Sequence, residues 1–299
     1  MKRRHLGDQT GIAWLLAAPA LLGLALFVLL PFGLALGLSF TNLRLGSPLP
    51  LEFVGLEQFR RIFSDPAFVR ATGNNLLFAA VVVPLQTALA LGLAVLLNRG
   101  LKGSVLFRTL FFMPVVFPMS LVAVVWVLIY APGPDGMLNA LLDQLSFGHW
   151  QARDFLRDGQ LALPAIMLLS IWQGAGFQMV ILLAGLQAVP AELYEAAALD
   201  GAGRWRQFRD ITLPQLRNPL VFVMLLTTIL AFRLFDQVQI MTRGGPDNAT
   251  TTVMYEAVQA LFGRQEVARA SAMAVVFFLL VLAVTLVQRR LVRQERQVK

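Results

Sequence analysis

Cysteine is absent from this chain of 299 residues, and histidine occurs only at His5 and His149. Without cysteine there is no disulfide framework and no thiolate that could act as a nucleophile or bind a metal. The two histidines lie far apart in the sequence, which argues against a histidine-rich metal site. We therefore predict no metal and no catalytic residue on this chain.

Charge is also scarce. Asp, Glu, Lys and Arg make up 14% of the residues, whereas a soluble domain carries about a quarter. Length alone would suggest about two soluble domains. Long charge-free stretches overrule that expectation, because they approach the ~20 residues needed to cross ~30 Å of hydrocarbon. They cover residues 15–38, 76–97, 110–130, 161–186 and 270–288, and a sixth, 220–241, contains only Arg233 and Asp236.

A backbone in lipid must satisfy its own hydrogen bonds, so these stretches must be helices. We predict an all-α, polytopic membrane protein with a six-helix transmembrane domain at 12–288, an N-terminal tail at 1–11 and a basic tail at 289–299. We expect the first helix to be a retained anchor rather than a cleaved signal peptide, because its apolar run is too long and no clean cleavage site follows. The predicted helices lie at about 12–39, 74–98, 109–130, 160–187, 219–241 and 267–288.

The net charge of +8 could suggest nucleic acid, but the positions of the basic residues argue otherwise. If the N-terminus lies inside and the helices alternate, the inner segments hold 15 basic residues and the outer loops hold nine. This is the bias of the positive-inside rule. We therefore predict that both termini are cytoplasmic, that the chain contacts membrane lipid, and that it binds no nucleic acid.

The inner segment at 188–218 differs from the other loops because it is long, charged and helix-prone. Pro190, Glu192 and Glu195 suit the positive N-terminal end of a helix. Three alanines follow; they favour a helix and have little bulk, so another surface can approach closely.

Gly201 and Gly203 are expected to end this helix and allow a sharp turn. A second short helix should follow at about 204–211, with its apolar residues near one face. The result is a compact helix–turn–helix on the inner side of the membrane. Physical reasoning alone leaves two interpretations open, an amphipathic segment on the lipid surface and an element that docks to another protein.

The same segment carries a long motif. Glu195-Ala196-Ala197 is followed after three residues by Gly201, and after nine more by Ile211-Thr212-Leu213-Pro214. This spacing resembles the Glu-Ala-Ala (EAA) signature of permease subunits of binding-protein-dependent ABC importers. Further stretches resemble the sugar branch of that family, which includes the maltose and glycerol-3-phosphate importer permeases. These stretches are 53–59, 108–114, 185–190 and 244–252.

The resemblance implies the type I ABC importer permease fold, in a bacterial plasma (inner) membrane. It also implies that the loop at 188–218 contains the coupling helix, which sits in a groove of a cytoplasmic ATPase subunit and moves as the ATPase dimer closes. The residues implied in ATPase coupling are Glu195, Ala196, Ala197, Asp200, Gly201, Ile211, Leu213 and Pro214.

Energy must come from another polypeptide. A P-loop needs Gly-Lys followed by Ser or Thr, and none of the three lysines, Lys2, Lys102 and Lys299, follows a glycine. The resemblance implies a dimer of ATP-binding subunits, a second homologous permease, and a periplasmic or lipid-anchored solute-binding protein. This chain would then hold no cofactor and would pass a sugar or a small polyol.

Polar side chains inside membrane helices usually face a cavity or a neighbouring helix. Arg233 and Asp236 are three residues apart and could pair on one helix face; a structural ion pair and a role in the solute path both stay open. The resemblance to maltose-type permeases implies a pocket on the fourth and fifth helices. The predicted path residues are Gln173, Gly174, Phe177, Thr227, Leu230, Ala231, Arg233, Leu234 and Asp236.

The members of this set on the fifth helix are less polar than a pocket for hydroxyl groups would require. Either a partner permease supplies most of the contacts, or this subunit only lines the path. The alternative class is a secondary transporter driven by an ion gradient, which would favour buried carboxylates and internal repeats. The sequence offers only Asp236 and no repeat. An intramembrane enzyme would need a nucleophile with a base, or a metal site, and this sequence indicates neither.

Overall fold

The computed structural model describes residues 6–99 and 103–294. These residues are helical apart from loops and one isolated antiparallel bridge between Thr41 and Phe53. Five helices are long and apolar enough to cross a membrane, or six if one bent pair of helices counts as a single span. The all-α membrane fold is therefore confirmed. The five spans are Ala13–Leu38, Pro66–Leu97, Ala162–Gln187, Arg217–Met241 and Val267–Arg290.

One compact unit comprises residues 1–65 and 257–278. Its first span is a succession of helical pieces rather than one regular helix. Pro31 lies at the start of the last piece; it lacks an N–H and clashes with the carbonyl four residues earlier, which fits the wider π-helical turn just before it. The elements are α1 (Leu6–Leu24), the π-helix η1 (Ala25–Leu29), α2 (Leu30–Leu38), α3 (Glu57–Phe63), the π-helix η3 (Gln259–Gly263) and the start of α15 (Val267–Gln294).

Loop contacts hold this unit together. The Leu45 N–H donates to the Gln265 carbonyl at 2.9 Å, and the Ala268 N–H donates to the Leu43 carbonyl at 3.0 Å. Arg269 forms an ion pair with Asp65. These contacts tie the loop after α2, and Asp65 after α3, to the start of α15 and to the residues just before it.

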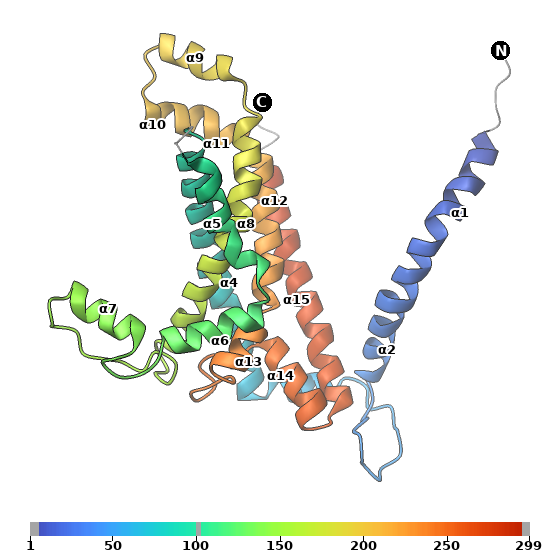
Figure 1. Cartoon of the computed structure of the whole chain (residues 1–299). Coiled ribbons are helices and arrows are strands. Elements are labelled where there is room, and N and C mark those ends of the chain that lie inside the picture. The colour runs from blue at the N-terminus through green and yellow to red at the C-terminus, as the bar shows by residue number, and fades with distance from the viewer. Residues whose placement is uncertain (1–5, 100–102, 295–299) are drawn as a thin grey trace. The chain divides into compact units, whose positions relative to one another are not determined.

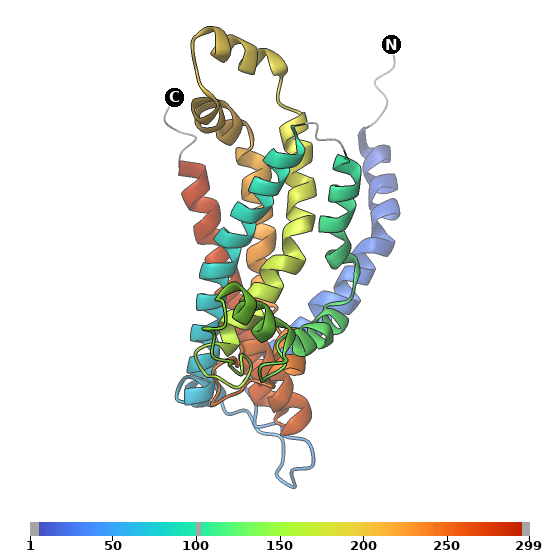
Figure 2. The ribbon, with the colours of Figure 1, turned by 60° about the vertical axis from the view of Figure 1, so that its left-hand side comes forward.

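The second unit comprises residues 66–256 and 279–299. Its long helices run side by side in both views (Figures 1 and 2). They are α4 (Pro66–Leu97), α5 (Ser104–Val116), α8 (Ala162–Gln187) and α12 (Arg217–Phe232). The shorter elements are α6 (Met119–Ile129), α7 (Met137–Leu145), α9 (Ala191–Leu199), α10 (Arg204–Gln207), the π-helix η2 (Phe208–Thr212), α11 (Leu213–Gln215), α13 (Asp236–Met241) and α14 (Val253–Val258).

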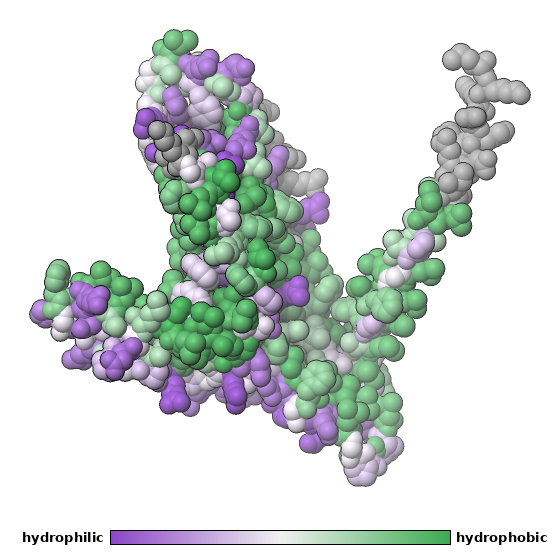
Figure 3. All heavy atoms as spheres, viewed as in Figure 1, coloured by the Kyte–Doolittle hydropathy of each residue, from purple (hydrophilic) through white to green (hydrophobic). Residues whose placement is uncertain are grey.

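Small residues let these helices approach one another. Ala90 and Ala94 of α4 are fully buried against Met179 and Leu182 of α8 and Leu216 before α12. Association of membrane helices depends on such close packing, because lipid offers no hydrophobic drive between apolar surfaces. Apolar side chains cover the middle of this bundle and polar ones gather at its ends (Figure 3), as expected of a surface that faces lipid.

The predicted third helix at 109–130 is wrong as a single straight element. It consists of α5 and α6, which meet at an angle of 101°. Phe117 is extended, with φ −80° and ψ 141°, because the residue before a proline is disfavoured in the helical region. Pro118 then caps α6.

The predicted fifth helix at 219–241 is also broken. It ends at Phe232 and resumes at Asp236 as α13. The expectation that Arg233 and Asp236 share one helix face is therefore wrong, and no ion pair joins them within residues 103–294.

Helix ends and loops differ from the expectations elsewhere. α1 begins at Leu6 inside the predicted tail at 1–11, and α15 ends at Gln294 inside the predicted tail at 289–299. Residues 1–5 and 295–299 of these tails lie outside the described residues. The threonine-rich stretch at residues 250–252 follows a turn, and its hydroxyl groups bond to backbone and side-chain oxygens.

Candidate functional site

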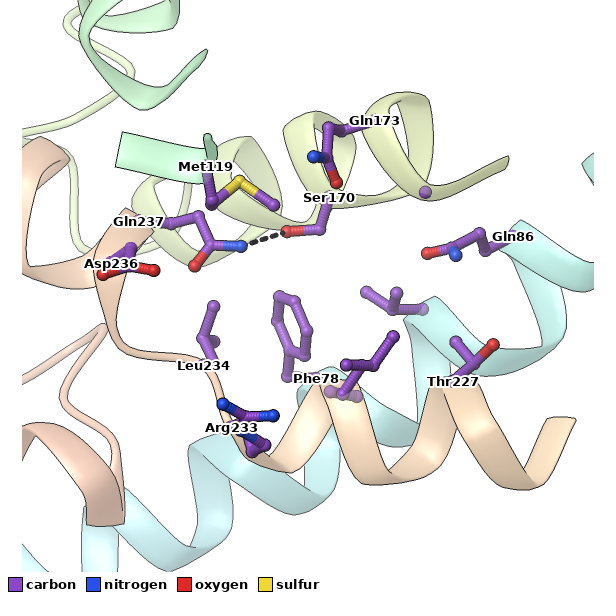
Figure 4. Close-up of a pocket in the computed structure, with 14 residues that line it drawn as sticks. Phe78, Gln86, Met119, Ser170, Gln173, Thr227, Arg233, Leu234, Asp236 and Gln237 are labelled. Carbon is purple, nitrogen blue, oxygen red and sulfur yellow. Dashed lines mark hydrogen bonds between the residues drawn. The ribbon is translucent and has the colours of Figure 1, made fainter. Parts of the chain in front are cut away.

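A pocket of about 270 Å³ opens among α4, α6, α8, α12 and α13 (Figure 4). Both apolar and hydrogen-bonding side chains line it. They are Phe78, Val82 and Gln86 from α4, Met119 from α6, Ser170, Gln173 and Gly174 from α8, and Thr227, Leu230, Ala231, Arg233, Leu234, Asp236 and Gln237 from the broken fifth span.

Of the nine residues predicted along a solute path, only Phe177 does not line this pocket. Phe177 lies on α8 and is 37% exposed. Thr227, Leu230 and Ala231 share one face of α12, because residues at i, i+3 and i+4 do so, whereas Arg233, Leu234 and Asp236 lie in or next to the break between α12 and α13. Their part in solute passage stays a prediction.

Hydrogen bonds across helices fix several polar groups at the pocket. Gln178 on α8 donates to Thr227 on α12, and the Thr227 hydroxyl donates to the Val223 carbonyl at 2.7 Å. Gln237 donates to the Ser170 hydroxyl at 3.4 Å. These bonds join α8 to both halves of the broken span. The arrangement leaves amide and hydroxyl groups facing the space beside apolar walls.

The charges at the pocket are one of each sign. Arg233 lies beside Leu234 at the end of α12, and Asp236 lies beside Gln237 at the start of α13 (Figure 4). Both charged side chains are exposed. The pocket can therefore offer a donor and an acceptor to one solute.

Sequence reasoning missed the contribution of α4. Gln86 is 6% exposed and Phe78 2% exposed, yet both line the pocket. A signal was present, since a glutamine inside an apolar membrane helix is expected to face a cavity or another helix. Phe78 offers no such signal, because the sequence of an apolar helix does not distinguish an apolar residue that faces a pocket from one that faces lipid.

The segment at 188–218 forms a second candidate site. As predicted, its first helix, α9, ends just before the two glycines. The Gly201 N–H donates to the Ala198 carbonyl at 3.0 Å, and the Ala202 N–H donates to the Ala197 carbonyl at 2.8 Å. With Gly201 at φ +74°, this is a Schellman motif. A glycine is favoured there because a side chain would strain a left-handed backbone.

One face of this segment is free within the described chain. α9 has no buried residue, Leu199 is 90% exposed and Trp205 is 72% exposed. The Tyr194 hydroxyl lies 3.0 Å from that of Thr212 and ties α9 to η2. The segment therefore holds its shape while presenting apolar groups outward. Exposed apolar patches of this kind mark interaction surfaces.

We expected both Glu192 and Glu195 to lie at the N-terminal end of a helix, but only one of them does. Glu192 lies in the first turn of α9, whereas Glu195 lies one turn further on and is exposed. The helix dipole acts mainly within the first turn, so it favours Glu192. Glu195 forms no ion pair within residues 103–294.

The second short helix runs as α10, η2 and α11, so the predicted helix at 204–211 is confirmed but continues beyond Ile211. Ile211 and Leu213 are half-buried, and Pro214 is exposed. On the exposed face, the hydrogen bond from Arg209 holds the pKa of the Asp210 carboxyl below its ordinary value. Asp210 is therefore ionised at neutral pH.

Comparison with known proteins assigns a family. A family described as binding-protein-dependent transport system inner membrane component matches residues 86–297. The chain is 37% identical over 277 residues to the diacetylchitobiose uptake system permease protein of Streptomyces coelicolor, covering 89% of this chain and 77% of that one. It is 36% identical over 290 residues to the sulfoquinovosyl glycerol transport system permease protein of Agrobacterium fabrum, covering 96% and 92%.

A third relative is the sn-glycerol-3-phosphate transport system permease protein of Yersinia pestis. It is 33% identical over 291 residues, covering 96% of this chain and 95% of that protein. Among solved structures, a chain of a bacterial ABC transporter that imports the acidic polysaccharide alginate matches with a TM-score of 0.81 at 21% identity. The match covers 99% of this chain and 100% of the other, so the two share a fold.

Proposed function

Since this chain belongs to the family of binding-protein-dependent transport system inner membrane components and is a multi-pass permease of an ABC importer, we propose that its solute is a sugar or a related small polyol. The observation that carries the proposal is the composition of the pocket. Gln86 and Gln173 offer hydrogen bonds to hydroxyl groups, and Phe78 offers an apolar surface. A sugar has both hydroxyl groups and apolar ring faces.

The relatives support the same class of solute. Their names refer to diacetylchitobiose, sulfoquinovosyl glycerol and sn-glycerol-3-phosphate, which all carry hydroxyl groups. Two of these solutes are anionic and one is neutral. Because the pocket has one basic and one acidic residue, Arg233 and Asp236, it favours a polyhydroxylated solute without selecting its charge.

We further propose that α9 is the coupling helix and that the ATP-hydrolysing site lies on a separate pair of subunits. A second homologous permease would complete the solute path. The exposed face of α9 and its stable Schellman end support this assignment. Glu195, Ala196, Ala197, Asp200 and Gly201 would then meet the ATPase.

The test is reconstitution of this chain in liposomes with its partner permease, ATPase and binding protein. We expect solute-loaded binding protein to stimulate ATP hydrolysis and to drive uptake. Both should be lost with an ATPase variant that binds ATP but does not hydrolyse it. Uptake that survives that variant and disappears when ion gradients are collapsed would instead support the secondary-transporter alternative.

We also propose that both termini lie in the cytoplasm. The motivation is the excess of basic residues in the segments placed inside, 15 against nine. Single cysteines introduced at Ser47, His149 and the exposed Arg264 should react with an impermeant thiol reagent added outside. A cysteine at Leu199, which is 90% exposed, should react only after the membrane is opened.

Any labelling of this chain would come from the introduced cysteine, because the chain has no cysteine of its own. His149 is preferred to its neighbour Gly148, which has φ +83° and would be strained by a side chain. Labelling of the Leu199 position in intact cells, or protection of the other three, would contradict the orientation.

A further inference from the structure

The interruption of the fifth span needs a physical cause, because residues 233–235 contain neither proline nor glycine. It lies inside the span Arg217–Met241. Irregular backbone at membrane depth is tolerated only where protein or a cavity supplies partners. The Phe235 carbonyl has one within the chain, since it accepts from the Gln239 N–H at 2.8 Å.

Two side chains from elsewhere reach two further carbonyls at the interruption. The Asn75 amide donates to the Phe232 carbonyl at 3.3 Å. The Thr252 hydroxyl donates to the Leu234 carbonyl at 2.8 Å. Both side chains are fully buried, with 0% exposure. Leaving a buried carbonyl without its donor costs more than the bond contributes when it is made.

The two donors are themselves connected. The Asn75 side-chain oxygen accepts from the Val253 N–H at 2.9 Å, next to Thr252 in the chain. The neighbouring Asn74 donates to the carbonyls of Asn248 and Thr251, at 3.2 and 2.9 Å. α4 therefore holds the turn at 248–252, and that turn places the Thr252 hydroxyl against the interruption.

The interruption is also what directs residues into the pocket. Arg233, Leu234, Asp236 and Gln237 all line it (Figure 4), whereas Asn75 and Thr252 do not. In a continuous helix, Arg233 and Asp236 would lie on the same helix face, and their side chains would point in other directions than they do beside the interruption. We propose that Asn75 and Thr252 are positioning residues that stabilise the break between α12 and α13. By doing so they set the positions of the pocket residues that contact the solute. The proposal rests on the function proposed above.

The experiment compares Thr252→Val with Thr252→Ser in the reconstituted transporter. Valine has the shape of threonine and no donor, whereas serine keeps the hydroxyl. We expect Thr252→Val to raise the solute concentration for half-maximal uptake about fivefold or more, a change of the size that an unpaired buried acceptor produces, and Thr252→Ser to stay near wild type. Asn75→Leu should change solute dependence in the same direction.

The matched control is Thr72→Val on α4, one turn from Asn75. The Thr72 hydroxyl bonds only within its own helix, to the Phe68 carbonyl at 2.9 Å, so its loss should leave solute dependence unchanged. Wild-type solute dependence in Thr252→Val would overturn the proposal. So would a lower amount of assembled complex with unchanged half-saturation, because the bond would then serve folding alone. If the wild-type complex itself shows no solute-stimulated uptake, the failure lies in the proposed function instead.

Discussion

Reversing the charge of Glu195, or replacing Gly201 by Asp, should reduce solute uptake to background while the permease stays in the membrane. Glu195 is exposed on α9 and forms no ion pair within residues 103–294. A lysine there would repel a cationic group in the ATPase groove instead of attracting it. Coupling would fail, and solute binding by the separate binding protein would be unaffected.

Gly201 acts through the backbone. No atom lies within 4 Å of the position where its Cβ would stand, so a side chain causes no internal clash. The cost is about 1 kcal/mol from the left-handed backbone at φ +74°, which loosens the Schellman end of α9. A side chain would also project outward, between the helix and its groove. The measurement is uptake together with ATP hydrolysis stimulated by solute-loaded binding protein.

Gly203→Asp is the matched control, because it adds the same charge two residues further on. Gly203 has an extended backbone, with φ −68° and ψ 167°, and no atom near its Cβ position. Aspartate is compatible with that conformation, and we expect most of the uptake to remain. Glu195→Gln should lie between wild type and Glu195→Lys. Full uptake and full stimulation in both Glu195→Lys and Gly201→Asp would remove α9 as the coupling element.

The spans and the turn at Gly201 could be predicted because their signals are local. A charge-free run long enough to cross lipid must be helical wherever it packs. Gly201 follows a run of alanines, and glycine at that point ends a helix in most contexts. The bend at Pro118 was also readable in principle, since a proline restricts the residue before it.

The interruption at 233–235 could not be read in the same way. Its residues include no proline or glycine, and the donors that meet its carbonyls come from Asn75 and Thr252, which lie at distant positions in the sequence. For the same reason, the α4 wall of the pocket was missed. A sequence places polar residues on a helix face, but it does not say which neighbouring helix that face will meet.

Two glycines on α8, two residues apart, should respond very differently to the same substitution. A Cβ at Gly176 would overlap the backbone carbonyl oxygen of Phe111 on α5 and stand 2.6 Å from its carbonyl carbon. The three atoms nearest to a Cβ at Gly174 would all belong to the amide end of the Gln86 side chain. A backbone cannot move without separating two helices, whereas a side-chain amide can turn away.

We therefore expect Gly176→Ala to lower the amount of assembled transporter several-fold, because overpacking of a tight contact costs about 1–3 kcal/mol and small residues are what let membrane helices touch. Gly174→Ala should assemble normally. It should instead raise the solute concentration for half-maximal uptake, because Gln86 lines the pocket and must shift. Quantifying the permease in purified complexes, alongside uptake per complex, separates the two effects. Normal assembly of Gly176→Ala would mean that α5 and α8 do not approach this closely in the membrane. Unchanged solute dependence in Gly174→Ala would argue that Gln86 does not contact the solute.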